Sequence, residues 1–125
     1  MKVKSKKTLK KSCETAWASI VRSKGYCEVC HAENIPLNAH HIIGRGCIIL
    51  RYDFRNSCCL CVNCHEFSRD SVKNNPIKFL DWFKETRPED YDYIKSKSNQ
   101  IAHYTILDLQ EILKNLKVIY DTLTS

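Results

Sequence analysis

The sequence predicts a small α+β protein, in which helices at both ends of the chain enclose two short strands. Three observations predict it. Apolar residues recur at helical spacing near both ends, two strand-like segments lie between residues 39 and 60, and two Cys-x-x-Cys pairs bracket these segments. At 125 residues the chain fits one domain with a small core. A structural metal would therefore matter for its stability.

The first predicted helix covers residues 8–24. Its apolar positions recur every three or four residues, and Gly25 stands where the helix should stop. Those positions are Leu9, Cys13, Ala16, Trp17, Ile20 and Val21.

A basic arm is predicted over residues 1–12, which hold six lysines and no acid. The other 113 residues carry 14 basic and 14 acidic groups, so the arm holds the whole net charge of +6. Such an arm can bind phosphates through counterion release, or it can be a solvated, frayed terminus. The charge run does not decide between the two.

A strand–loop–strand–helix order is predicted in the middle of the chain. Residues 39–43 favour a strand, Gly44 and Gly46 break it, and a loop follows to about Arg55. Residues 58–60 favour the return strand, and residues 62–73 favour a helix.

Three further helices are predicted after residue 74. Asn75-Pro76 begins the first and Pro88 the second, because proline suits the first position of a helix. Residues 95–100 favour a linker, after which Thr105 and Asp108 resemble a capping box. The last helix has a short heptad-like pattern, formed by Ile106, Leu109, Leu113, Leu116, Tyr120 and Leu123. Fewer than three heptads favours packing within the chain over dimerisation.

These elements predict a three-part division of the chain. Residues 1–12 form the arm, residues 13–95 form the metal-stapled domain, and residues 96–125 form a helical extension packed on it. No apolar run approaches the roughly 20 residues of a membrane span, and the N-terminus has no apolar segment typical of a secretory signal. We therefore expect no membrane partner and a reducing, cytoplasmic setting.

Eight cysteines in a reducing setting indicate metal ligation or free thiols rather than disulfides. Two halves, Cys27-x-x-Cys30 and Cys61-x-x-Cys64, give the four thiolates of a closed structural Zn²⁺ site. Cys58-x-x-Cys61 is an alternative second half, and His31 is an alternative fourth ligand.

The segments HHIIGRG, LRYDFRN and CLCVNCH lie in order within residues 40–65. In these segments the chain resembles the HNH endonucleases of the ββα-metal superfamily, especially small phage and prophage HNH proteins with paired Cys-x-x-Cys motifs. The resemblance covers residues 26–83. It implies a ββα-metal core with a structural zinc knuckle, flanked by the N-terminal helix and the C-terminal helices, and a cytoplasmic site of action in the host cell.

The resemblance also implies roles for four residues. His40 stands at the position of the first ligand of a catalytic divalent metal, such as Mg²⁺, Mn²⁺, Ni²⁺ or Zn²⁺, and His65 at that of the second. His41 stands at the position of the general base, since neighbouring residues of a strand face opposite ways. Asn56 would pin the loop between the strands and orient His41.

Arginines are predicted to bind phosphate near these histidines. Arg69 stands where many relatives have a further metal ligand, and its permanent charge favours phosphate contact instead. Arg45 and Arg51 lie in the loop between the strands, and their guanidinium groups match phosphate oxygens. Ordinary solvated charge is the alternative for this loop.

The predicted function is nicking or cutting of double-stranded DNA, alone, as a homodimer or with a phage protein. The rival is a non-catalytic, zinc-stapled DNA-binding module in a phage packaging or recombination assembly. A third reading keeps the chemistry and changes the substrate to RNA or to structured junctions.

Overall fold

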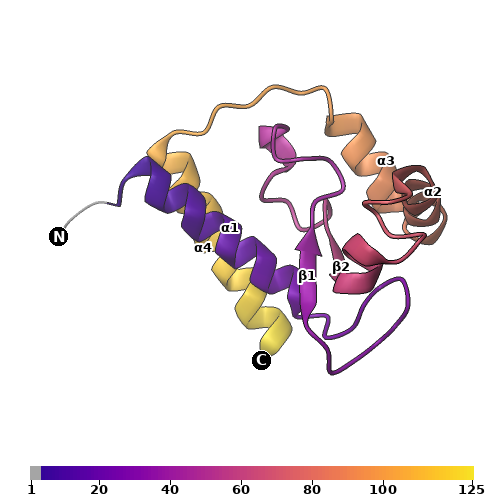
Figure 1. Ribbon diagram of the computed structural model, residues 1–125. Helices are drawn as coiled ribbons and strands as arrows, with labels where there is room; N and C mark the ends of the chain where they lie inside the picture. The colour runs from indigo at the N-terminus through magenta and orange to yellow at the C-terminus, as the bar shows by residue number, and fades with distance from the viewer. Residues whose placement is uncertain (1–3) are drawn as a thin grey trace.

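Helices on two sides of a two-stranded sheet make up the structure, a computed structural model that describes residues 4–125 (Figure 1). Lys2, part of the predicted basic arm, lies outside the described residues. The elements in chain order are α1 (Lys6–Arg22), β1 (Leu37–His40), a short 3-10 helix (Ile48–Leu50), β2 (Cys58–Cys61), a π-helix (Asn63–Phe67), α2 (Pro76–Thr86), α3 (Pro88–Lys97) and α4 (Ile106–Thr124). Helices around two antiparallel strands are thus confirmed.

The sheet joins β1 and β2 in antiparallel register, with Leu37 opposite Cys61 and His40 opposite Cys58. Leu37 and Ala39 pack toward the core formed with α1. The alternate residues of β1 point to the other face, where the His40 ring meets the edge of Phe79.

The first strand begins and ends earlier than predicted. Residues 39–43 were expected to be extended, but the strand ends at His40. It ends there because the Asn56 side chain accepts a hydrogen bond from the N–H of Ile43 and donates one to its carbonyl. The return strand reaches Cys61, one residue beyond the predicted 58–60.

Helices α1 and α4 lie side by side and form one wall of the core (Figure 1). Their buried contacts include Trp17 from α1 and Leu109, Leu113 and Leu116 from α4. The helix α4 starts with the predicted capping box between Thr105 and Asp108. The lysines from position 6 onward in the predicted arm belong to α1.

The opposite wall consists of α2 and α3, which start at the two predicted prolines. Arg87, between these helices, donates to the backbone carbonyls of Arg55 and Ser57 and pairs with the buried carboxylate of Glu28. A buried carboxylate is favourable only when it is paired in this way. The Arg87 contacts therefore fix α2 and α3 to the edge of the sheet.

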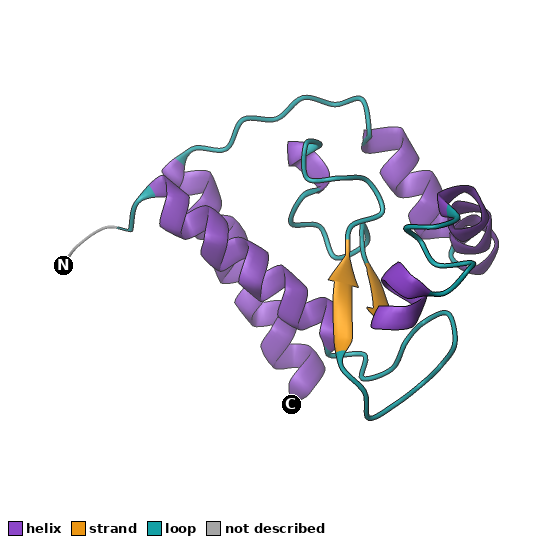
Figure 2. Cartoon of the chain, in the orientation of Figure 1, coloured by secondary structure: helices purple, strands orange, loops and turns teal. Residues whose placement is uncertain are grey.

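The helix predicted over residues 62–73 is only the five-residue π-helix, followed by turns (Figure 2). The side chains of Ser71 and Asn74 donate to the carbonyl of Glu66, and Asn74 also donates to that of Ser68. These bonds satisfy carbonyls that a continuing helix would have used.

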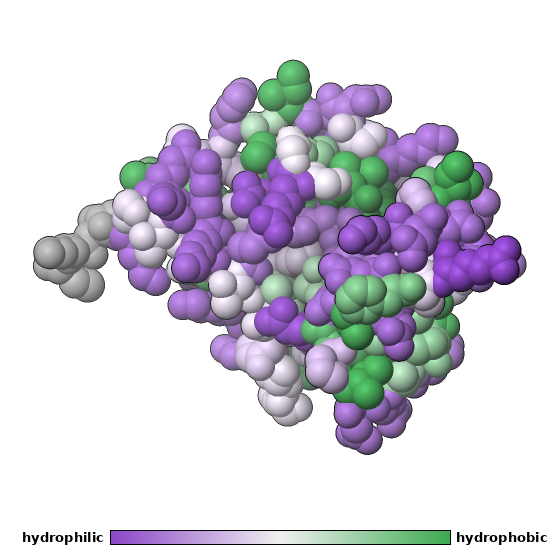
Figure 3. Space-filling model, in the orientation of Figure 1, coloured by the Kyte–Doolittle hydropathy of each residue, from purple (hydrophilic) through white to green (hydrophobic). Residues whose placement is uncertain are grey.

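Polar side chains cover most of the face seen in Figure 3, with small apolar patches between them. Among residues 4–125, no helix combines the length and the apolar composition that crossing a bilayer requires.

The α1–α4 contact predicts a large difference between two leucines of α4. Leu109 is 0% exposed and Leu107 is 76% exposed. Replacing Leu109 with alanine should lower the free energy of unfolding by roughly 2–5 kcal/mol, because it leaves a cavity. The matched change Leu107→Ala should alter it by less than about 0.5 kcal/mol. Urea unfolding monitored by circular dichroism measures both, and equal losses would contradict this packing.

Candidate functional site

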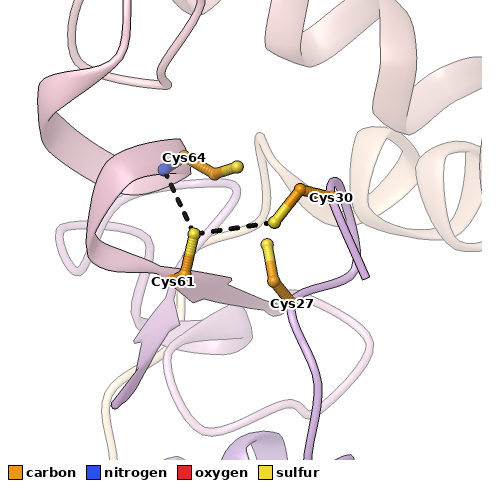
Figure 4. A group of neighbouring side chains, drawn as sticks. All are labelled: Cys27, Cys30, Cys61 and Cys64. Atoms are coloured by element: carbon orange, nitrogen blue, oxygen red, sulfur yellow. Dashed lines mark hydrogen bonds between the residues drawn. The ribbon is translucent and has the colours of Figure 1, made fainter. Parts of the chain in front are cut away.

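Four cysteines from three segments come together at one end of the sheet (Figure 4). Cys27 and Cys30 lie in the turn after α1, Cys61 ends β2, and Cys64 lies in the π-helix. Their sulfur atoms all lie within 4.8 Å of one another, and the Cys30 and Cys61 sulfurs are 3.8 Å apart.

This arrangement fits a tetrahedral metal ion. Zinc–sulfur bonds of about 2.3 Å in a tetrahedron place the sulfurs about 3.8 Å apart. The backbone N–H of Cys64 points at the sulfur of Cys61, 3.5 Å away. Burial alone would raise the pKa of the Cys27 thiol, but hydrogen bonds from backbone groups outweigh burial and lower the pKa to about 7. The four residues can thus hold a metal ion, consistent with structural zinc.

The turn that carries the first cysteine pair closes on itself. The N–H of His31 donates to the carbonyl of Cys27 (2.8 Å), and the N–H of Cys27 donates to the carbonyl of Ala32 (3.0 Å). His31 adopts a φ of 64°, in the left-handed region that such a tight turn requires. His31 and Cys58, the two alternatives considered above, are not among the four clustered ligands.

A pair of histidines lies on the face of the sheet turned away from α1. The rings of His40, at the end of β1, and His65, in the π-helix, have centroids 5.1 Å apart. Asn38 Nδ2 lies 3.2 Å from Nδ1 of His65. Burial, followed by the charges of His65 and His41, lowers the pKa of His40 to about 4. A neutral His40 keeps a lone pair for a metal ion.

His41 turns to the opposite side, toward α1. Its ring stacks on Trp17 at 3.8 Å with an interplanar angle of 8°, and the Trp17 indole N–H donates to the carbonyl of Asp53. Nε2 of His41 lies 2.8 Å from the carbonyl oxygen of Arg51. Because a carbonyl only accepts, Nε2 must carry the proton, and the lone pair of neutral His41 is on Nδ1. Burial also lowers the pKa of His41, which favours this neutral form.

Asn56 is 0% exposed and organises the loop between the strands. Its Oδ1 accepts from the N–H of Ile43 (2.7 Å), and its Nδ2 donates to the carbonyls of Ile43 (2.9 Å) and Leu50 (3.1 Å). Leu50 precedes Arg51, whose carbonyl holds His41. Asn56 therefore acts on His41 through the loop.

Two of the predicted phosphate-binding arginines converge on one carboxylate. Arg45 lies 3.5 Å and Arg51 lies 3.4 Å from Glu14 of α1. Glu14 is also 4.0 Å from Nε2 of His41. The side chain of Arg45 is 69% exposed, so it remains open to a ligand.

Arg69, the third predicted phosphate-binding arginine, lies apart from this group, as does Arg55 of the loop between the strands. Arg55 binds Asp90 (3.0 Å) and covers the ring of Tyr93, so its guanidinium already has structural contacts. Arg69 is exposed beyond the end of the π-helix. The helix predicted over residues 62–73 would have placed Arg69 about one turn after His65, but the helix ends at Phe67.

Glu14 is a site residue that the motif does not reveal. It lies on α1, far along the chain from the loop that it contacts, and no spacing rule connects the two. One signal was present, since Glu14 is the single acidic residue among the first 27. An isolated acid in a basic helix is a candidate for a specific pairing.

Comparisons with protein-family models, with curated proteins and with solved structures find no match for this chain.

Loss of one clustered thiol should remove the metal. We expect Cys64→Ser to lower the metal content of the purified protein well below one ion per chain, and the free energy of unfolding by roughly 4 kcal/mol or more. Cys47→Ser, a cysteine outside the cluster, should keep the metal. Elemental analysis with thermal unfolding measures both effects, and a fully loaded Cys64→Ser protein would contradict the site.

Proposed function

We propose that this chain is a metal-dependent HNH endonuclease, a phosphodiester hydrolase that nicks or cuts duplex DNA. One observation carries the proposal. Two adjacent histidines separate at the end of β1, so that His40 approaches His65 while His41 is held with a free Nδ1. Metal binding and proton transfer need such a division of tasks.

His40 and His65 are the side chains that would hold a divalent ion. Within residues 4–125, the cysteine cluster is the only set of three or more His, Cys, Asp or Glu ligands that meets, so this pair has no third ligand of these kinds. When bound, the ion would stabilise negative charge on the phosphate and on the leaving oxygen. Neutral imidazoles suit Ni²⁺ and Zn²⁺, and phosphate oxygens and waters, which also suit Mg²⁺ and Mn²⁺, would complete the coordination.

His41 would accept the proton of the attacking water at Nδ1. The carbonyl of Arg51 fixes the ring through Nε2, and stacking on Trp17 fixes its plane. Protonation would create an imidazolium 4.0 Å from the Glu14 carboxylate, which stabilises that charge. Arg45 and Arg51, gathered near the same point, would bind the phosphate backbone.

The rival, a zinc-stapled DNA-binding module without chemistry, shares the cysteine cluster and the arginines. That function does not explain why His41 is held through Nε2 while its Nδ1 keeps a free lone pair. Substitution of that residue separates the two functions.

We expect His41→Ala to lower the rate of plasmid nicking by roughly 10²–10⁴-fold, because the proton acceptor is lost. Metal content and DNA affinity should remain those of the unchanged protein. His31→Gly is the matched control: it removes an exposed histidine outside the site, at a φ that glycine adopts readily, and should cut normally.

Nicking is measured from the conversion of supercoiled plasmid to open circles in Mg²⁺, Mn²⁺ or Ni²⁺. Folded, zinc-loaded protein that never nicks DNA with any of these ions would overturn the endonuclease proposal in favour of its rival.

Glu14 should oppose DNA binding, since its carboxylate forms ion pairs with the guanidinium groups of Arg45 and Arg51. We expect Glu14→Gln to raise the affinity for duplex DNA by roughly 2–5-fold, the size of a partly exposed ion pair. Fluorescence anisotropy with a labelled duplex measures the change. A weaker complex would show instead that Glu14 is needed to hold the arginines in place.

A further inference from the structure

A small basic groove lies beside the candidate site. It encloses about 130 Å³ between the start of α1, the loop after β1 and the segment that leads into α4. Four of its lining residues carry basic side chains, and none is acidic: Lys6, Lys10, Arg51 and His103. Tyr52 and Tyr104 add the hydroxyl groups of the lining.

The groove is continuous with the candidate site through Arg51. The backbone carbonyl of this residue holds His41, its guanidinium reaches Glu14, and the residue also lines the groove. Arg51 is therefore shared by the candidate site and the groove.

The lysines of the groove belong to a formed helix. Lys6 and Lys10 are one turn apart on α1, so both project from the same face. The segment with His103 crosses near the start of that helix (Figure 1). Basic groups brought together from three segments make a defined position for an anion, which a run of lysines in a frayed terminus would not.

We propose that this groove binds a backbone phosphate of DNA adjacent to the phosphate that is cut, an assignment that rests on the proposed function. Lysines supply point charges, and Arg51 supplies a guanidinium that matches phosphate oxygens. Burial raises the pKa of Tyr52 and Tyr104, so their hydroxyls stay protonated and can donate. The groove extends the DNA contact from the histidines to the N-terminal helix.

Two double variants test this site with an equal loss of charge. The first variant, Lys6→Gln with Lys10→Gln, removes both lysines from the groove. Both positions are exposed on α1, and glutamine is a good helix former, so the helix should be preserved. The control is Lys84→Gln with Lys95→Gln, exposed lysines of α2 and α3 on the other side of the sheet (Figure 1). His103→Gln tests the third segment separately.

The measurement is anisotropy of a labelled DNA duplex between about 50 and 200 mM salt, without added divalent metal. The groove variant should bind roughly tenfold more weakly than the unchanged protein. Its slope of log affinity against log salt should be shallower by about 0.9, the loss of one phosphate contact. His103→Gln should weaken binding in the same direction, and the control should stay within about twofold.

Equal weakening by the two double variants would show that only net charge matters, and would overturn the groove. The proposed phosphate site would also be overturned if the groove variant bound DNA as tightly as the unsubstituted protein, or if the unsubstituted protein bound no duplex. Nicking assays distinguish this failure from that of the endonuclease. Binding that depends on the groove without any nicking defeats the endonuclease alone, whereas nicking with binding independent of the groove defeats the groove alone.

Discussion

The four-cysteine cluster is the constraint on which the position of the candidate site depends. The π-helix that carries His65 has only five residues, too few to be stable by its own hydrogen bonds. Cys64 lies next to His65 and joins this short helix to Cys61 at the end of β2 and to the turn after α1. A metal ion held by the four thiolates would fix His65 opposite His40. Metal binding would then both stabilise the fold and set the geometry of the histidine pair.

The division between His40 and His41 has its origin in the backbone. Successive residues at the end of an extended strand face opposite ways, so the two rings separate to the π-helix side and the α1 side. The strand ends there because buried Asn56 bonds the backbone of Ile43. A polar side chain without exposure is tolerated because all of its hydrogen-bonding groups at this position are satisfied. One amide therefore ends the strand and shapes the loop that holds His41.

Local signals in the sequence predicted the parts of the fold that local interactions determine. Asn75-Pro76, Pro88 and the Thr105 capping box begin helices where expected, because caps act over three or four residues. The two Cys-x-x-Cys pairs pointed to the thiol cluster, since metal ligands have restricted spacing. The contacts of Glu14 and the groove at Lys6 depend on residues distant in the chain. Contacts between distant residues leave no regular spacing along the sequence from which they could be predicted.

The most direct measurement is the binding of Mn²⁺ by titration calorimetry to zinc-loaded and zinc-depleted protein, with His65→Ala as the reference. If the cysteine-bound metal positions His65, the loaded protein binds one Mn²⁺ and the His65→Ala protein binds none. The depleted protein should lose this binding while the helicity of α1 and α4 persists. Depleted protein that binds Mn²⁺ as tightly as the loaded form would contradict the dependence of the histidine site on the cysteine cluster.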